Sequence, residues 1–183
     1  MRAGVLRPWL AVLLILTLAG CGGGGGGGSP VEPTPPPPQP GVTFTGQGGS
    51  ANNSVVLASG AGTNVNALVL EVRAQNVDDL YGAAFDLRFP AAVLQYARFT
   101  PGPLLEGGSV QVAPSGSGNL VVGFSRLGEV PGLDGSGVLL TLEFAPVAAG
   151  EGALSFARNS AFDSDGRPIT GFTWAGGTVR VVR

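Results

Sequence analysis

The amino-acid sequence predicts an all-β fold, an antiparallel β-sandwich of about nine strands, and three observations predict it. Apolar and polar residues alternate with period two over much of residues 42–182, as in strands with one buried face. Glycine, proline, asparagine and aspartate cluster between the alternating segments, where turns are expected. No segment after residue 21 has the apolar stripe of an amphipathic helix. Many short strands joined by polar turns favour a sandwich.

The alternation gives each predicted strand an inner and an outer side. Tyr81 has the same parity as Phe85, so both are expected in the core. The clearest alternation lies near residue 140, where Val138 is expected to face inward and Leu139 outward. The predicted strands are, in chain order, 42–45, 68–74, 81–89, 110–113, 120–124, 138–144, 153–156 and 178–182.

Residues 1–20 are expected to be a signal peptide rather than part of the fold. Arg2 and Arg7 precede an apolar run, 9–18, that is much shorter than the roughly 20 residues a membrane-spanning helix needs. The sequence Leu18-Ala19-Gly20-Cys21 then resembles the lipobox of bacterial lipoproteins. The resemblance implies that Cys21, the only cysteine, is lipidated and becomes the first mature residue. An ordinary signal peptide with an incidental cysteine is the alternative.

The residue after Cys21 bears on where the anchored protein resides. Gly22 stands where an Asp would resemble an inner-membrane retention signal, so the resemblance implies an extracytoplasmic protein of the cell envelope, held at the outer membrane. An acyl chain attaches a protein to a membrane without a spanning helix.

A linker is predicted at residues 21–40, before a single domain at 41–183. Seven glycines, 22–28, are expected to form flexible coil, and the proline-rich residues 30–40 a stiff polyproline II spacer. The proline-rich segment could instead be a ligand for aromatic-groove domains. The 143 residues that follow are enough for one sizeable core.

The composition excludes several classes of site. The chain has no histidine, no lysine and one cysteine, which excludes His-dependent triads, His/Cys zinc sites, disulfides and Schiff-base chemistry. No pair of carboxylates is marked out as acid and base, so we expect no enzyme activity and no cofactor. Ten arginines against twelve acids give a net charge of −2, without the basic cluster that a nucleic-acid partner needs. Without residues 1–20, eight arginines against the same twelve acids give −4.

Segments spread over residues 42–182 resemble, in order and spacing, the cohesin modules. The resemblance implies a nine-stranded jelly-roll sandwich without catalytic activity. It also implies a partner protein, because cohesins bind dockerins, small calcium-loaded modules of secreted enzymes, and so assemble polysaccharide-degrading complexes. The matching segments are Asn76 to Phe89, Val93-Leu94, Gly102 before Leu104-Leu105, Phe124 to Gly128, Gly135 and Gly137 before 138–144, Gly150 before 153–156, Asp165-Gly166 and Gly177 to Val179.

The resemblance also points to a binding face, on the outward side of two strands. Many cohesins carry an Asn and an Asp that meet the dockerin on the first of these strands. This chain has Gly82 and Ala84 there, which leaves Asp86 and Arg88 as its polar groups. A small, flat face could still pack a partner helix through close backbone approach. The residues predicted for the face are Gly82, Ala84, Asp86, Arg88, Val121, Gly123, Ser125 and Leu127.

Two further functions remain open from the sequence. Trp174 is either a platform for a sugar ring, which would make the domain a carbohydrate-binding module, or part of the core. A structural role in the envelope or in secretion would use an exposed sheet edge to recruit a partner strand.

One short segment resembles the start of a calcium loop. Asp163 and Asp165, followed by Gly166, have the right opening spacing, but no acid follows in the next four residues. We therefore interpret the segment as an Asp/Gly turn and expect no metal site.

Overall fold

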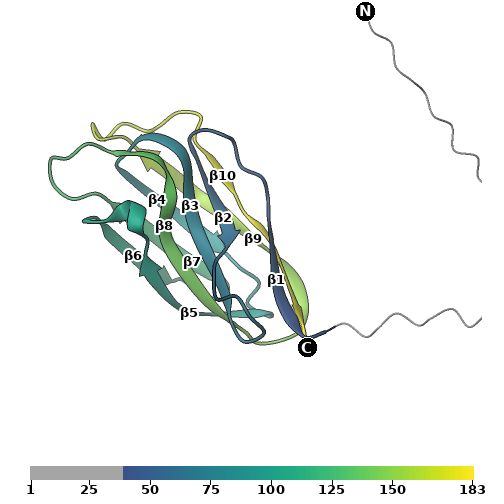
Figure 1. Ribbon diagram of the computed structural model, residues 1–183. Coiled ribbons are helices and arrows are strands. Elements are labelled where there is room, and N and C mark those ends of the chain that lie inside the picture. The colour runs from purple at the N-terminus through teal and green to yellow at the C-terminus, as the bar shows by residue number, and fades with distance from the viewer. Residues whose placement is uncertain (1–38) are drawn as a thin grey trace, which may run out of the picture. The chain divides into compact units, whose positions relative to one another are not determined.

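Residues 39–183, which the computed structural model describes, form two β-sheets packed face to face (Figure 1). One sheet has six strands in the order β1-β11-β9-β4-β7-β6, and the other has five in the order β10-β2-β3-β8-β5. A single 3₁₀ turn, η1, spans Pro103–Leu105 within the described residues. The strands are β1 Gly41–Gly46, β2 Ser54–Ser59, β3 Leu68–Leu80, β4 Gly82–Arg88, β5 Leu94–Pro101, β6 Ser109–Pro114, β7 Asn119–Ser125, β8 Leu133–Pro146, β9 Gly150–Phe162, β10 Thr173–Ala175 and β11 Gly177–Val182.

The fold class predicted from the alternation is confirmed. Neighbouring strands pair antiparallel, with the single exception within residues 39–183 of β10, which pairs parallel with β2. The register aligns residues of like parity across each sheet: Leu70 lies opposite Leu142 on β3 and β8, and Phe85 lies opposite Val122 on β4 and β7. Because side chains alternate between the two faces of a strand, this register gathers the apolar residues on one side.

The core fills the space between the two sheets. Its largest fully buried side chains come from strands of both sheets, and removing them from water is the main stabilising contribution to a sandwich of this kind. They are Phe85, Phe144, Leu68, Leu70, Leu80, Leu87, Leu94, Leu120, Leu139, Leu140, Leu142 and Leu154.

Three strands of the structure were not among the strands predicted from alternation. In β2, four consecutive residues, Ser54 to Leu57, are all buried, so the strand has no period-two pattern to detect. β5 lies at the edge of its sheet and is mostly exposed, and β10 has only three residues. The chain therefore has more strands than the sequence predicted, within the same two-layer architecture.

The predicted orientation of Val138 and Leu139 is wrong. Leu139 is fully buried and Val138 is only half-buried. The cause is an irregularity in the pairing of β3 with β8: Val72 lies opposite Leu140 and Arg73 opposite Val138, so Leu139 is an extra residue. A β-bulge of this kind shifts the parity of a strand at one point.

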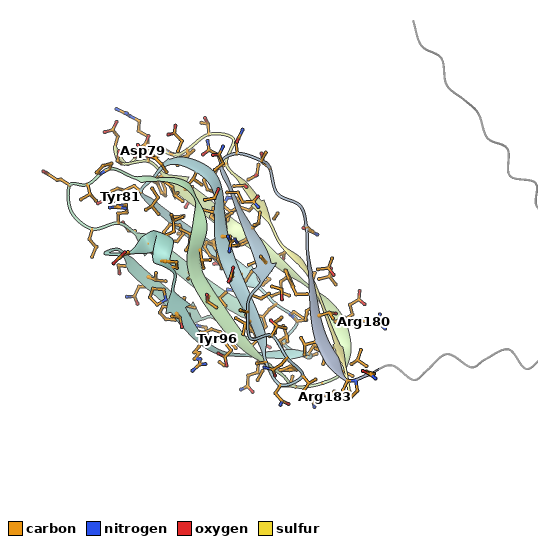
Figure 2. The ribbon with its side chains drawn as sticks, in the orientation of Figure 1. Asp79, Tyr81, Tyr96, Arg180 and Arg183 are labelled. Carbon is orange, nitrogen blue, oxygen red and sulfur yellow. The ribbon has the colours of Figure 1, made fainter. Side chains whose placement is uncertain are left out.

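The start of the described residues and the C-terminus lie at the same end of the sandwich. β1 begins beside the end of β11, with Gly41 opposite Val182, so residues 39–41 and the C-terminus share one end (Figure 1). Asp79 and Tyr81 lie at the opposite end, far from Arg183 (Figure 2). No helix within residues 39–183 is long and apolar enough to cross a membrane.

Candidate functional site

The outward face of four neighbouring strands is built mainly from small side chains. The register places Ala84 of β4 between Gly123 of β7 and Ser160 of β9, and Gly123 lies opposite Gln111 of β6. We call this surface the small-residue face. It consists of Ser155, Ala157, Arg158, Ser160 and Phe162 on β9, Gly82, Ala84, Asp86 and Arg88 on β4, Asn119, Val121, Gly123 and Ser125 on β7, and Ser109, Gln111 and Ala113 on β6.

Three hollows open along the small-residue face. One, of about 780 Å³, lies at the Tyr81 end and is called the end pocket. A shallow one of about 270 Å³ lies on β6 and β7, between Gln111 and Ser125, beside the end pocket. The third, of about 460 Å³, lies around Asp86 and Arg88 at the other end of β4. The face therefore has hollows at both ends of β4 into which a partner could insert side chains.

The end pocket is formed where loops meet the face, and its lining is mostly apolar. Tyr81 is half-buried there rather than in the core, because its hydroxyl donates a hydrogen bond to the carbonyl of Gly128 in the β7–β8 loop, at 2.5 Å. The prediction that Tyr81 packs in the core is thus wrong. Phe162, at the end of β9, is 36 % exposed on the pocket's rim. The β7–β8 loop also carries Leu127, which is 60 % exposed.

One carboxylate fastens the loops around the end pocket. Asp79 Oδ1 accepts a hydrogen bond from the backbone N–H of Gly132, and its Oδ2 accepts hydrogen bonds from the backbone N–H and the hydroxyl of Ser164. The N–H of Asp79 itself donates to Asp134. The hydroxyl of Ser164, followed by the two backbone N–H groups, lowers the pKa of Asp79 because each donor stabilises the charged form. The ionised carboxylate at the end of β3 therefore holds two loops, the β7–β8 loop and the loop after β9.

Asp86 occupies the other end of the face, beneath an arginine. It is 5 % exposed although its parity is outward, because Arg158 of β9 folds over it. Arg158 Nε donates to Asp86 Oδ2 at 2.7 Å, and a terminal nitrogen of the same guanidinium also donates to this oxygen. Asn119 donates to it as well, at 3.3 Å. The polar group exposed here is thus Arg158 rather than Asp86.

Seven of the eight residues predicted for the binding face lie together on the small-residue face. Ala84, Arg88 and Val121 are exposed, whereas Gly82 and Asp86 are buried. The eighth, Leu127, follows the end of β7 in the loop beside the end pocket. Sequence reasoning missed Arg158, Asn119, Gln111 and Phe162. The strand predicted at 153–156 stops before Arg158 and Phe162. A bulge interrupts the alternation of β9 between these two parts of the strand, so no period-two signal marks either residue. That the predicted residues bind a partner stays a prediction.

Trp174 packs between the two sheets. Its ring lies 5.3 Å from that of Phe85 and 5.2 Å from that of Phe156, both on the six-stranded sheet, and 5.3 Å from that of Phe172. The half-buried tryptophan therefore belongs to an aromatic cluster at the edge of the core. Such tilted contacts between rings contribute to packing, which leaves little of the ring face for a sugar.

The segment with Asp163 and Asp165 forms a turn after β9. Asp163 Oδ1 accepts hydrogen bonds from the backbone N–H groups of Asp165 and Arg167, and Asp165 forms an ion pair with the Arg167 side chain. Nowhere in residues 39–183 do three His, Cys, Asp or Glu side chains gather as metal ligands would. Cys21, the signal peptide and nearly all of the linker lie outside the described residues, so their predictions stand as predictions.

Comparison with known proteins gives a likeness at the level of structure. No family model matches the chain, and no curated protein matches it by sequence. Solved cohesin structures do match. A non-cellulosomal cohesin from the archaeon Archaeoglobus fulgidus is 20 % identical, with a TM-score of 0.56 over 78 % of this chain and 92 % of that one. A type II cohesin from Bacteroides cellulosolvens is 11 % identical, with a TM-score of 0.59 over 71 % of this chain and 98 % of that one.

A third match was solved with a partner bound. The sixth cohesin of scaffoldin B from Acetivibrio cellulolyticus, in complex with a mutant Cel5 dockerin, is 18 % identical, with a TM-score of 0.55 over 68 % of this chain and 95 % of that one. Likeness at these identities concerns the fold, which agrees with the resemblance in the order of the sequence segments. The described part of the chain has the β-sandwich fold of cohesin domains.

Proposed function

We propose that this chain is a non-catalytic docking module whose small-residue face binds a dockerin-type module of a partner protein. The observation that carries the proposal is the face itself: four strands with small outward side chains and three hollows on the same surface. The cohesin fold supports it, because structures of that fold include complexes with dockerins. Composition supports it too, since the chain has no histidine or lysine with which to build common catalytic sites.

The surface chemistry suits a partner helix. Glycine, alanine and serine at the centre of the face let a helix backbone approach closely, and Gly123 has open space above it. Val121 and Phe162, at 42 % and 36 % exposed, supply apolar area on either side of that floor. Leu127 adds a further apolar side chain beside the end pocket. Apolar groups gathered around a hollow are typical of protein interaction sites.

Membrane attachment is a separate part of the proposal. The lipobox-like sequence supports an acyl anchor on Cys21 in the cell envelope, at the outer membrane, with the Gly/Pro linker as a stalk. A module displayed in this way would hold secreted, polysaccharide-degrading enzymes at the cell surface. Changing Cys21→Ser should move the protein from the membrane fraction to the soluble fraction. Its retention in membranes would refute the anchor and leave the docking proposal intact.

A capture experiment tests the docking function. The purified chain is immobilised and exposed to lysate and culture fluid of the organism that encodes it, then eluted first with EDTA and next with soluble glycans. We expect EDTA to release a protein with paired calcium-loop repeats, identified by mass spectrometry, because removing calcium unfolds a calcium-dependent module. Release by glycans would indicate carbohydrate binding instead. Capture of envelope proteins alone, insensitive to both eluants, would indicate the structural role.

Two matched variants test whether the partner binds the small-residue face. Gly123→Trp puts a bulky side chain in the middle of the small-residue face, where a new Cβ meets no atom within 4 Å, so the fold should tolerate it. Thr141→Trp adds the same ring to β8, outward on the five-stranded sheet. We expect Gly123→Trp to weaken capture by about 100-fold or more, as for hot-spot positions, and Thr141→Trp to leave it unchanged. Equal effects from both variants would show that the partner does not bind this face.

A further inference from the structure

The hollow at the Arg88 end of the small-residue face differs from the rest of the face in its charge. It is lined by two arginines and by polar groups of the β6–β7 turn, and we call it the arginine corner: Arg88, Arg158, Asn119, Ser115 and Ser117 around a volume of about 460 Å³. Asp86 forms its floor. The end pocket, by contrast, contains no arginine and has two acids, Glu129 and Asp163, in its lining.

The arginine corner carries a net positive charge that nothing in the described residues neutralises. Arg158 is paired with Asp86, so their charges cancel. Arg88 is exposed and forms no ion pair within residues 39–183. One unit of positive charge is therefore left. The Arg158 side chain is 72 % exposed, and since a guanidinium has five N–H groups, several remain available above Asp86.

Asn119 helps to hold the floor of the corner. Its Nδ2 donates to Asp86, and its Oδ1 is buried beneath the surface of the corner. Because that oxygen is covered by protein atoms, an occupant does not reach it. The groups open to an occupant are the guanidinium groups of Arg88 and Arg158, which favour an acceptor with negative charge.

The backbone of Arg158, in the arginine corner, adopts an unfavourable conformation. Between Ala84 and Asp86 the pairing of β4 with β9 slips by one residue, and Arg158 lies in this bulge with a φ of 47°. Residues other than glycine rarely adopt that left-handed conformation. The bulge directs the Arg158 side chain over Asp86. Backbone strain and bulges of this kind are concentrated at binding sites.

We propose that the arginine corner binds the carboxylate of an Asp or Glu in the partner's docking segment. This inference rests on the proposed docking function and names the chemistry of the partner. The planar guanidinium of an arginine matches a carboxylate in shape and can donate two N–H groups to it. Because arginines line only one end of the face, an acidic residue bound there would also fix the direction in which the segment lies along β4.

The spacing of the two ends gives the segment a pattern. Gly82, at the end pocket, and Arg88 are six residues apart on β4, which is about 20 Å at roughly 3.3 Å per residue. A helix covers that length in about 13 residues at 1.5 Å each. A helix lying along β4 would thus carry its acidic residue between three and four turns away from the apolar side chain that fills the end pocket.

The experiment uses a small probe, so that it needs no natural partner. The full chain with Cys21→Ser, which cannot be lipidated, is labelled with ¹⁵N and titrated with N-acetyl-aspartate N-methylamide, which offers one carboxylate and two amide N–H groups. We expect the side-chain signals of Arg88, Arg158 and Asn119 to shift, with a dissociation constant of about 1–10 mM for a ligand of this size. The matching asparagine compound, equal in shape and uncharged, should shift these signals at least fivefold less at the same concentration.

Two arginine variants show whether the corner acts as a site or as general positive charge. Arg88→Gln should weaken binding of the aspartate probe at least fivefold. Arg180→Gln removes another exposed arginine, on β11 of the same sheet, and should leave binding unchanged. Equal losses in both variants, equal binding of the asparagine compound, or the absence of any shift would overturn the proposal. So would inorganic phosphate binding at least as tightly as the aspartate probe, because the corner would then be a general anion site.

The probe and the capture experiment fail independently. If the aspartate probe binds and no calcium-loop protein is captured, the carboxylate site stands and the dockerin-type partner is wrong. If a partner is captured through the Gly123 region and the probe fails to bind, the docking face stands and the acidic contact is wrong.

Discussion

The two outer faces of the sandwich satisfy their polar groups in different ways. On the five-stranded sheet, charged side chains pair with one another: Arg73 lies 2.6 Å from Glu71, and Arg98 lies 2.6 Å from Glu143 on the neighbouring strand. On the small-residue face, the centre is bare, and the one ion pair, of Arg158 with Asp86, leaves Arg88 without an anion within the described residues. A face whose charges are paired internally is complete in water, whereas a face with bare small residues and an unneutralised charge gains from being covered. The difference therefore supports the small-residue face as the side on which the proposed partner binds.

The largest change in stability should come from removing Trp174, which packs one sheet against the other. Trp174 belongs to the five-stranded sheet and packs on Phe85 and Phe156 of the other. Trp174→Ala should lower the free energy of unfolding by about 3 kcal/mol, because a large aromatic contact is lost and a cavity remains. Denaturant unfolding measures this loss, and Trp174→Phe should recover most of it. Unchanged stability in the alanine variant would mean that the ring is a surface platform, as a sugar-binding role needs.

A smaller effect, confined to one end of the small-residue face, should follow from removing the Asp79 charge. Asp79→Asn keeps one acceptor oxygen and loses the carboxylate that fastens the loops of Gly132 and Ser164. The folded-state pKa of Asp79 lies below its ordinary value of 3.8, so its contribution to stability is fully present above that pH and is lost as the pH falls through the folded-state value. The variant should therefore melt at a lower temperature than the wild type at pH 7, and the difference should shrink towards pH 2.

The neighbouring Asp78 supplies the matched control for this measurement. Its side chain is exposed, and only its backbone N–H is used in the loop contacts, donating to Asn53. Asp78→Asn should leave the melting temperature nearly unchanged at both pH values. A difference between wild type and Asp79→Asn that does not depend on pH would show that the loops are held by other contacts than the ionised carboxylate.

The sequence predicts the fold well because alternation is a local signal that tertiary packing preserves. The inward positions of β3, β4 and β7 follow directly from their period-two pattern. The pattern fails where the structure departs from regular pairing. At Leu139 an extra residue reverses the parity, and in β2 both sides are covered, so no alternation exists to detect. Bulges and two-sided burial depend on neighbouring strands, and a local pattern carries no information about them.

The candidate site was predicted only in outline for the same reason. Parity places Ala84, Gly123 and Arg88 outward, and all three are on the small-residue face. Parity also places Asp86 outward, yet it is buried, because Arg158, 72 residues further along the chain, covers it. Similarly, Asp79 resembles an ordinary solvated turn residue until the loops containing Gly132 and Ser164 come together around it. Contacts between distant segments decide the charge of a surface, and alternation cannot supply them.

The smallest effect should come from breaking an ion pair on the outer face of the five-stranded sheet. Arg98 and Glu143 lie directly opposite each other on β5 and β8, with side chains 72 % and 30 % exposed. A pair this exposed is screened by water, so Arg98→Gln should cost about 0.2–1 kcal/mol in the free energy of unfolding, and less in 1 M salt. Capture of the partner should not change, since the pair lies on the face that is already complete. A loss of capture in Arg98→Gln with the fold intact would show that the partner contacts this ion pair. The docking site would then lie on the five-stranded sheet.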